Sequence, residues 1–238
     1  MIRARCHPKL RALLPAPVPA ASALPDWLKS MPSEVAAPTL GGAAVRTFKH
    51  CPPMIDALAL GVLIPLATDI TVAGGEMSWD WDPPILDDAL ISRAPLGLHV
   101  PEQATGAPLR LATNAVVKFM NFWTLEVPEG WSLLFTHPLN REDLPFRSLS
   151  GVVDCDHFRD GYVHFPALWT NPAFEGVLPR GTPVAQVIAI PRGAQALDVG
   201  HMTEDEVARN REMQRALSEE RGVYRRNFRH SGKVGNAR

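Results

Sequence analysis

The stretch SGVVDCDHF, Ser150 to Phe158, decides how this chain is interpreted, together with GVLPRGTPVAQVIAI, Gly176 to Ile190, which follows it closely. The two adjacent valines are β-branched and predict a strand, and the acids after them are typical of a turn. Asp154 is therefore expected at the mouth of a hairpin. With Asp156 and His157 close by, the pattern fits a general base, a metal site or a plain turn.

Composition limits the class of protein before any motif is considered. The chain has 238 residues, of which 46% are hydrophobic and 21% charged, enough for one domain with appendages. The net charge of −1 argues against nucleic-acid binding. Three cysteines without a CxxC pair argue against a disulfide scaffold and a thiolate zinc site, and favour a cytoplasmic protein. No apolar run approaches the ~20 residues of a membrane span.

Three regions differ in their residue patterns. Residues 1–42 are rich in alanine and proline and predict an extended N-terminal arm with at most a short helix near Asp26. Residues 43–192 contain short β-branched and aromatic runs cut by proline and glycine, as in an all-β sandwich or barrel. In residues 193–238, a capping box at Thr203 predicts a helix. The basic tail that follows carries Arg221, Arg225, Arg226, Arg229, Lys233 and Arg238.

Three pieces of the β region occur in an order that resembles a known superfamily. They read LEVPEGWSLLFTHPLN, then SGVVDCDHFRDG, then ALWTNPAFEGVLPRGTPVAQVIAI, and together they cover about residues 125–190. This resembles the dUTPase and dCTP-deaminase superfamily. The chain also looks like an uncharacterised family of similar length from bacteria and their phages. The first resemblance implies a mainly β fold, a distorted antiparallel β-barrel of the β-clip type, assembled as a homotrimer with ligand sites between subunits.

The resemblance assigns roles to residues by their position in the motifs. Asp154 matches the carboxylate that activates water in dUTPases, and Gln186 matches a glutamine that contacts phosphate. His157 takes the place of a tyrosine that packs under the deoxyribose, where it adds a group that titrates near neutral pH. The predicted catalytic residue is thus Asp154, and the predicted ligand-binding residues are Val153, Asp156, His157, Gly181, Gln186 and His137.

The chain departs from the superfamily pattern at the positions that hold phosphate and metal. The expected Gly-x-Asp reads Gly61-Val62-Leu63, and the expected Arg-Ser-Gly reads Thr136-His137-Pro138. An arginine provides a bidentate fork for phosphate that a threonine and histidine do not. The strand at 162–169 lacks the glutamate that the deaminases need. Mg²⁺ is expected only through a bound phosphate ligand.

Other interpretations of the same residues stay open. Asp154 and Asp156 fit turn residues that cap backbone amides. A two-histidine, one-carboxylate metal site would draw on His137, His157 and His164 with Asp154 or Asp156, although no spacing brings two of them onto one strand face. Cys155 lies between two carboxylates, which raise its thiol pKa and make it a poor nucleophile.

These observations predict a protein that binds a nucleotide-like or other small anionic ligand between the subunits of a trimer. If Asp154 activates water, the protein is a hydrolase of the nucleoside triphosphate pyrophosphohydrolase type. The alternatives are a non-catalytic binding, regulatory or phage-related assembly module and a metalloenzyme built from the histidines.

Overall fold

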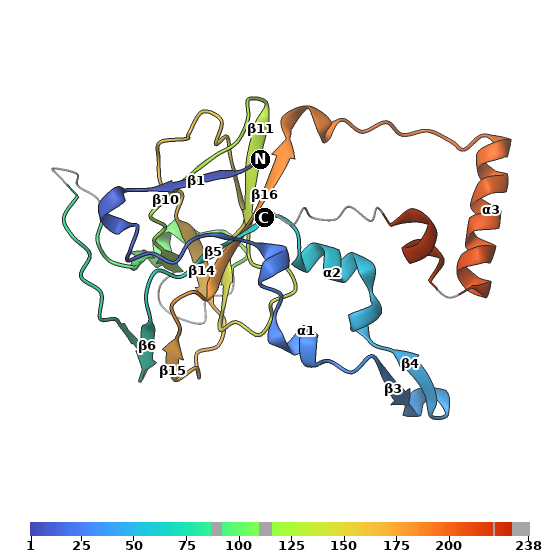
Figure 1. Ribbon diagram of the computed structural model, residues 1–238, viewed down its shortest axis with the longest axis horizontal. Coiled ribbons are helices and arrows are strands. Elements are labelled where there is room, and N and C mark those ends of the chain that lie inside the picture. The colour runs from blue at the N-terminus through green and yellow to red at the C-terminus, as the bar shows by residue number, and fades with distance from the viewer. Residues whose placement is uncertain (87–91, 110–115, 221, 230–238) are drawn as a thin grey trace. The chain divides into compact units, whose positions relative to one another are not determined.

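The chain folds into two compact units. The computed structural model describes residues 1–86, 92–109, 116–220 and 222–229 (Figure 1). The first unit combines Met1–Leu24 with Ala57–Ala194, and the second combines Pro25–Asp56 with Gln195–Arg238. Of the predicted basic tail, Arg221, Lys233 and Arg238 lie outside the described residues.

The candidate site lies on the largest sheet of the first unit. Its strand order is β13 (Gly151–Val153), β11 (Trp131–Thr136), β16 (Pro183–Pro191), β5 (Val62–Pro65) and β2 (Val18–Pro19), and every pairing is antiparallel. In the register, Leu133 faces Val153 on one side and Ala189 on the other. The two quoted stretches, Ser150–Phe158 and Gly176–Ile190, therefore supply the strands on either side of β11.

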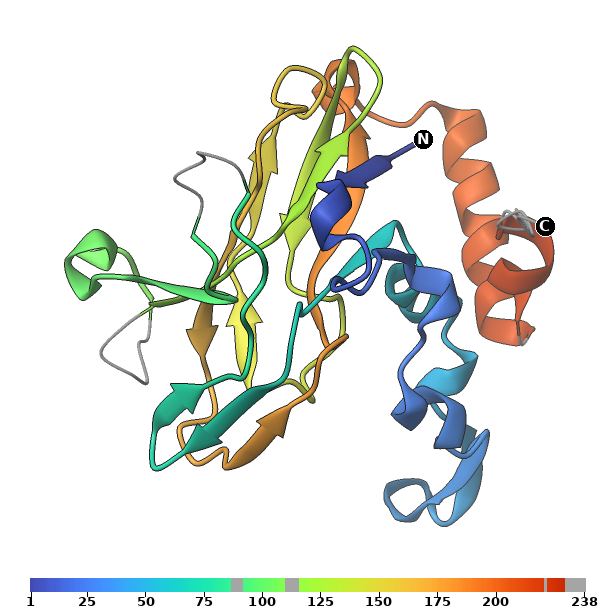
Figure 2. The same cartoon turned by 60° about the vertical axis from the view of Figure 1, so that its left-hand side comes forward.

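Three smaller antiparallel sheets complete the first unit (Figure 2). One contains β12 (Phe146–Ser148), β14 (Phe165–Trp169), β9 (Val116–Phe119) and β8 (Leu96–His99). Another contains β15 (Gly176–Leu178), β6 (Ile70–Ala73) and β7 (Glu76–Ser78), and the last pairs β1 (Arg3–Cys6) with β10 (Trp123–Glu126). Only two residues separate β12 from β13, so the chain passes from one sheet to another within a very short connection.

The predicted mainly β class, with a C-terminal helix, is confirmed, but the described strands do not close into a barrel. The largest sheet ends at β13 and β2, and the second ends at β12 and β8. Pro19 has no N–H to extend the ladder beyond β2.

The core of the first unit lies where these sheets face one another. Its buried side chains include Leu133, Phe135 and Val187 from the largest sheet and Phe119 and Phe165 from the second. Alternate residues of a strand point to opposite faces, so Leu133 and Phe135 of β11 both enter this core. Ser132, Leu134 and Thr136 point to the other face.

Much of the alanine- and proline-rich N-terminus is built into the first unit. Residues Arg3–Cys6 form β1, which pairs with β10, and Leu10 and Leu14 are buried in a cluster with Phe122 and Trp123. The backbone N–H of Ala20 donates to the carbonyl of Gly61 at 3.0 Å. Residues 1–24 are thus tied to the sheets by backbone pairing and by apolar contacts.

The second unit contains the remaining helices and one hairpin. Its elements are α1 (Asp26–Ser30), the hairpin of β3 (Glu34–Ala37) and β4 (Ala43–Arg46), the start of α2 (Pro52–Leu58), and α3 (Glu204–Glu219). Helix α1 forms where a short helix is predicted. Arg229 forms an ion pair with Asp56, with Nε at 3.0 Å from Oδ2.

The predicted capping box opens α3. The Thr203 hydroxyl accepts from the N–H of Glu206 at 3.3 Å, and the Glu206 carboxylate accepts from the N–H of Thr203 at 2.7 Å. Hydrogen bonds from Thr203 lower the pKa of Glu206, as expected for a carboxylate at a helix N-terminus. Among the described residues, no helix is both long and apolar enough to cross a membrane.

Candidate functional site

Asp154 stands at the end of β13, opposite Ser132 of β11. The register that pairs Leu133 with Val153 continues to these two residues, whose side chains lie on the face away from the core. The Ser132 hydroxyl donates to Asp154 Oδ1 at 2.5 Å, and Arg192 Nη1 lies 3.4 Å from the same oxygen. The Asp154 side chain is 59% exposed, and its Oδ2 has no partner within the described chain. One carboxylate oxygen is anchored and the other is open.

Asp156, two residues further on, is buried and fully engaged. The guanidinium of Arg192 forms a bidentate pair with the Asp156 carboxylate, in which Nη1 donates to Oδ1 at 2.9 Å and Nη2 donates to Oδ2. The N–H of Gly130 donates to Oδ2 at 3.0 Å. The Arg192 hydrogen bonds hold the pKa of Asp156 well below its usual range. The structure therefore gives this predicted ligand residue a role in fixing the turn.

Arg192 belongs to none of the motifs and was missed by sequence reasoning. It follows β16 directly, and its guanidinium also donates to the carbonyl of Trp131 at 2.9 Å. Its backbone N–H donates to the carbonyl of Gly130 at 3.0 Å. The single clue in the sequence is an arginine at the end of the apolar strand that pairs with β11. Its partner Asp156 is 36 residues earlier.

Cys155, Val153 and His157 complete the hairpin mouth. Cys155 is fully buried, and burial, with the two flanking carboxylates, raises its thiol pKa to about 11, as expected for a poor nucleophile. Val153 is half-buried and packs against the core. The His157 side chain is 76% exposed, with Nε2 at 3.8 Å from Asp156 Oδ2. Of the predicted ligand residues, Val153, Asp156 and His157 are thus brought together beside Asp154.

Gln186 lies at the other end of β11, opposite Thr136, and is buried. Its Oε1 accepts from the N–H of Leu139 at 2.8 Å, and its Nε2 donates to the carbonyls of Ala57 at 2.9 Å and Leu60 at 2.6 Å. The amide therefore ties two loops to β16 and uses its bonds within the protein. A phosphate contact of Gln186 stays a prediction, and it would require one of these internal hydrogen bonds to open.

Gly181 makes the predicted tight turn before β16. Its φ of +88° is in the left-handed region that glycine adopts readily. The N–H of Gly181 donates to the carbonyl of Leu66 at 2.9 Å, and the N–H of Leu66 donates to the carbonyl of Thr182 at 2.7 Å. The turn thereby aligns β16 with β5.

His137 follows β11 and is held by the backbone. Its Nε2 lies 2.9 Å from the Arg141 carbonyl and therefore carries the hydrogen, while Nδ1 accepts from the N–H of Ser148 at 3.3 Å. Burial lowers its pKa. A pocket of about 200 Å³ lies beside it, lined by Thr136, His137, Pro138, Leu139, Asn140, Glu142, Arg147, Ser148 and Ser150. This pocket and Asp154 lie at opposite ends of β11, about 13 Å apart at 3.3 Å per residue.

The histidines do not assemble a metal centre in the part of the chain that the structure describes. His164 accepts from the N–H of Asn121 through Nδ1 at 3.1 Å, and burial lowers its pKa. No group of three histidine, cysteine, aspartate or glutamate side chains that could hold a metal ion occurs among the described residues. The described residues therefore offer no set of metal ligands for the metalloenzyme alternative.

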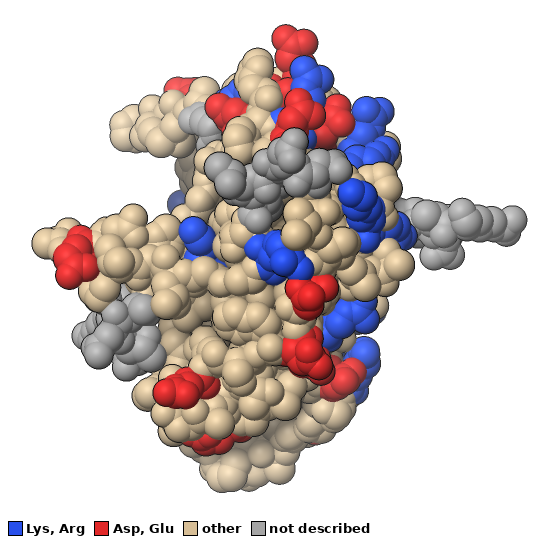
Figure 3. All heavy atoms as spheres, turned by 90° about the vertical axis from the view of Figure 1, so that its left-hand side faces the viewer, with Lys and Arg blue, Asp and Glu red and all other residues tan. Residues whose placement is uncertain are grey.

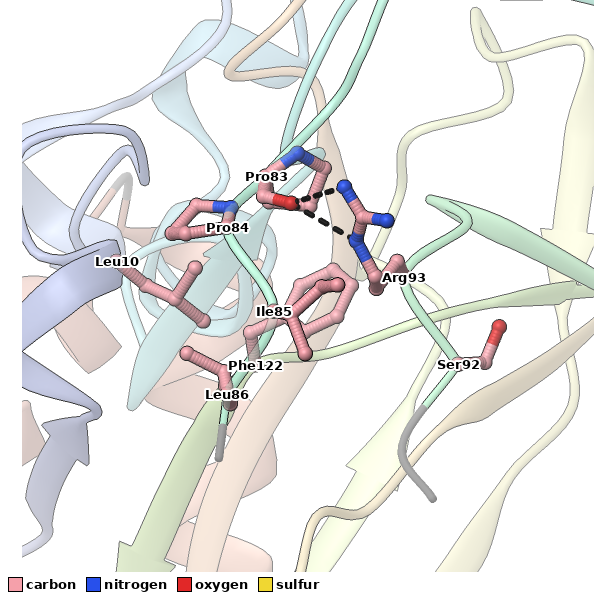
Figure 4. Close-up of a pocket in the computed structure, with 8 residues that line it drawn as sticks. All are labelled: Leu10, Pro83, Pro84, Ile85, Leu86, Ser92, Arg93 and Phe122. Atoms are coloured by element: carbon pink, nitrogen blue, oxygen red, sulfur yellow. Dashed lines mark hydrogen bonds between the residues drawn. The ribbon is translucent and has the colours of Figure 1, made fainter. Parts of the chain in front are cut away.

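Two further surface features lie outside the hairpin mouth. Figure 4 shows the side chains around a pocket at Pro83, Arg93 and Phe122, and its volume of about 30 Å³ suits a water rather than a ligand. Arg93 donates there to the carbonyl of Pro83 at 2.8 Å. On the face shown in Figure 3, most of the lysine and arginine side chains lie toward the right-hand side, with acidic side chains beside several of them.

Comparisons with known proteins give matches among solved structures alone. No protein-family model matches the chain, and no curated protein matches it. A mutant dUTPase from phage phi11 of Staphylococcus aureus, described for the coordination of a structural Mg(II) ion, is 13% identical over 46% of this chain and 97% of its own, with a TM-score of 0.27.

Two mutants of the dUTPase of Staphylococcus bacteriophage 80alpha, both with dUpNHpp, match in a similar way. One is 12% identical over 46% of this chain and 97% of its own, with a TM-score of 0.26. The other is 13% identical over 57% of this chain and 88% of its own, with a TM-score of 0.29. All three matched structures are phage dUTPases, and they are similar to about half of this chain.

Proposed function

We propose that this protein binds a nucleotide-like small molecule over the hairpin of β11 and β13, with Asp154 accepting hydrogen bonds from the ligand. The observation that carries the proposal is the state of the Asp154 carboxylate. Oδ1 is held by Ser132 and lies beside Arg192, whereas Oδ2, on a side chain that is 59% exposed, has no partner among the described residues. A fixed carboxylate with one open oxygen is suited to bind N–H or O–H donors.

Charge at the hairpin mouth favours the neutral part of such a ligand. Two carboxylates, Asp154 and Asp156, share one guanidinium, that of Arg192, so the local charge is negative. Arg192 is bound at both ends to Asp156 and cannot turn toward a phosphate without breaking that pair. We therefore assign the base or sugar, which offer N–H and O–H groups, to the Asp154 end.

The pocket at the opposite end of β11 is where an anionic part would lie. The Thr136 and Ser150 hydroxyls line it and lie 2.9 Å apart. Arg147 also lines it, in a salt bridge of 2.8 Å with Glu142 in which both side chains are more than half exposed. Exposed pairs of this kind contribute about 1 kcal/mol or less, so a phosphate can displace Glu142. Mg²⁺ would enter this end with the phosphate.

A more specific version of this proposal is that Asp154 also catalyses hydrolysis of the bound ligand. The open Oδ2 is the atom that would accept the proton from an attacking water. A non-catalytic binding module would use the same carboxylate without turnover. In this version the protein also assembles as a trimer, and a second subunit completes the site.

A binding assay with matched variants tests the proposal. Isothermal titration would compare deoxyuridine and deoxycytidine triphosphates, with Mg²⁺, against the nucleosides. Asp154→Asn keeps the side-chain shape but replaces one acceptor oxygen by a donor, so we expect at least tenfold weaker binding. Asp160→Asn, an exposed acid of the same loop, is the control and should bind as the wild type does.

Three outcomes decide between the forms of the proposal. Absence of binding to the wild type at millimolar nucleotide, or equal affinity for Asp154→Asn and wild type, would overturn the binding site. Arg147→Gln should weaken the triphosphates more than the nucleosides if the anionic part lies in the pocket at Arg147. Release of pyrophosphate by the wild type but not by Asp154→Asn would show hydrolysis, and binding without release would show a binding module.

A further inference from the structure

The turn after β13 places an aromatic residue one helical turn beyond Asp154. The backbone carbonyl of Asp154 accepts from the N–H of His157 at 3.0 Å and from the N–H of Phe158 at 2.8 Å. The second bond has the spacing of an α-helical turn, whose pitch is about 5.4 Å. Asp154 and Phe158 are therefore neighbours across a single turn that backbone hydrogen bonds hold.

Gly161 provides the space that the Phe158 ring occupies. A Cβ atom added to Gly161 would lie 2.1 Å from Cζ of Phe158 and 2.5 and 2.6 Å from its two Cε atoms. The far end of the ring thus rests on the glycine backbone, where the side chain of any other residue would meet it. Gly161 does not have a positive φ, so the backbone conformation itself does not demand a glycine. The ring does.

Phe158 is held in place in this way and is nevertheless 49% exposed. The turn does not depend on the ring for its stability, because Asp156 is paired with Arg192 and Cys155 is buried in the core. Phenylalanine has two side-chain torsions, so contact at its far end leaves the ring little freedom, and ordering it against a ligand costs little entropy. The exposed part of the ring is a rigid apolar surface next to Asp154.

The two side chains offer a ligand two different interactions. Asp154 Oδ2, which has no partner among the described residues, accepts a hydrogen bond. Phe158 offers the face of an aromatic ring. A sugar has hydroxyl donors but no flat face, whereas a nucleobase has both N–H donors at its edge and a π-face that stacks on aromatic side chains. The pair therefore favours a base over a sugar.

We propose that Phe158 is a stacking platform for the base of the ligand, which also donates to Asp154, and that Gly161 positions the ring. The platform rests on the function proposed above and makes it more specific, since the base rather than the sugar then lies at the Asp154 end. Phe158 becomes the residue that selects ligands with a planar ring. A ligand of equal charge without a base would lose this contact.

Isothermal titration of the full chain tests the platform. With Mg²⁺ present, deoxyuridine and deoxycytidine triphosphates are compared with 2-deoxyribose 5-triphosphate, which has the same sugar and phosphates but no base. Phe158→Leu stays apolar and loses the aromatic face, so it should weaken binding of the two nucleotides about fivefold or more and leave the base-free ligand unchanged. Phe48→Leu, at a phenylalanine that is 67% exposed, is the control and should bind all three as the wild type does.

Gly161→Ala tests the positioning, because it keeps the ring and moves it. It should weaken binding of the nucleotides as Phe158→Leu does. Adding it to Phe158→Leu should cause no further loss, since no ring remains to be displaced. Gly200→Ala, where an added Cβ meets nothing within 4 Å, is the matched control and should bind normally.

Proton NMR supplies a spectroscopic signature of stacking. Protons over the face of an aromatic ring shift upfield, so H5 and H6 of either bound pyrimidine nucleotide should move upfield with the wild type. The shift should disappear with Phe158→Leu and shrink with Gly161→Ala. A change that merely loosened the turn would weaken binding without this selective loss.

The possible results separate the platform from the binding site on which it rests. Weaker nucleotide binding in Asp154→Asn but not in Phe158→Leu would overturn the platform and leave the site. Equal loss of nucleotides and base-free ligand in Phe158→Leu, or no upfield shift with the wild type, would also overturn the platform. Unchanged binding in Gly161→Ala would overturn the positioning role of Gly161. Absence of binding of every triphosphate to the wild type at millimolar concentration would overturn both site and platform.

Discussion

Arg192 and Asp156 form a two-pronged salt bridge in which the Asp156 side chain is only 3% exposed. The bridge joins the end of β16 to the turn after β13, and the N–H of Gly130 donates to the same carboxylate. Asp154 lies beside this bridge and is oriented by it. The buried acid therefore fixes the turn, and the exposed acid keeps one carboxylate oxygen without a partner among the described residues.

Asp156→Asn should lower the stability of the protein, because the variant loses the ionic part of the bridge and leaves Arg192 with the exposed Asp154, 3.4 Å away, as its remaining counter-ion. Urea denaturation followed by tryptophan fluorescence measures the change in midpoint. Asp154→Asn is the control, since its carboxylate is exposed, and it should shift the midpoint little. Equal shifts in the two variants would contradict the structural role of Asp156.

The same pair predicts a dependence on pH. Because Arg192 lowers the pKa of Asp156, the stability from this carboxylate is complete above its unfolded pKa of about 3.9 and is lost as the pH falls below that value. The gap between the midpoints of wild type and Asp156→Asn should therefore narrow below about pH 4. A gap that stays constant from pH 7 down to the acid limit would exclude this coupling.

Gln186 should contribute mainly to stability. Gln186→Leu removes the acceptor of the Leu139 N–H and the donor to the Leu60 carbonyl, and one unsatisfied buried group costs about 1–3 kcal/mol. Gln186→Glu should cost more, because it places a carboxylate against two carbonyl oxygens. The free energy of unfolding, from urea titration, tests both, with the exposed Gln214→Leu as control. A stable Gln186→Leu protein with weaker nucleotide binding would point instead to a ligand contact.

The candidate hairpin was predictable from local sequence, whereas the hydrogen-bond partners of the polar residues in the candidate site were not. Two valines followed by acids indicate a strand and a turn, and Asp154 is exposed at that turn as expected. The partner of Asp156 is 36 residues away, and the carbonyls bound by Gln186 are more than 120 residues away. A motif records residue types and spacing, and these long-range hydrogen bonds leave no local pattern.

The fold of the N-terminus was also only partly predictable from local sequence. Its composition predicts an extended arm, and the short helix near Asp26 forms as α1. Yet β1 pairs with β10, and Leu10 and Leu14 are buried. The apolar residues lie in turns and short 3-10 segments, so they follow neither the helical nor the strand period from which burial is inferred.

His137 should make stability fall on mild acidification. Its pKa is lowered, so its contribution is complete above the unfolded value of about 6.5 and is lost as the pH falls below it. His137→Phe removes this contribution, and the midpoint gap between wild type and variant should be smaller at pH 5.5 than at pH 7.5, roughly one unit either side of that value. The pKa of His164 is also lowered, but His164 is present in both proteins, so its effect cancels in the midpoint gap. An equal gap at the two pH values would contradict a neutral His137.

Gly61 connects the backbone of β5 to the loop that Gln186 holds. Its φ is +70°, and an added Cβ would lie 2.1 Å from the carbonyl oxygen of Val187. Gly75 has a similar φ of +80° with nothing within 4 Å, so Gly75→Ala isolates the cost of the left-handed backbone, about 1–2 kcal/mol.

Gly61→Ala should therefore cost clearly more than Gly75→Ala in the free energy of unfolding. The extra loss arises because β16 and β5 must separate to admit the methyl group, which also moves the Leu60 carbonyl away from Gln186. Urea titration of the two variants gives the difference directly. If both substitutions cost the same, the close approach of Gly61 to β16 does not contribute to the stability of the sheet.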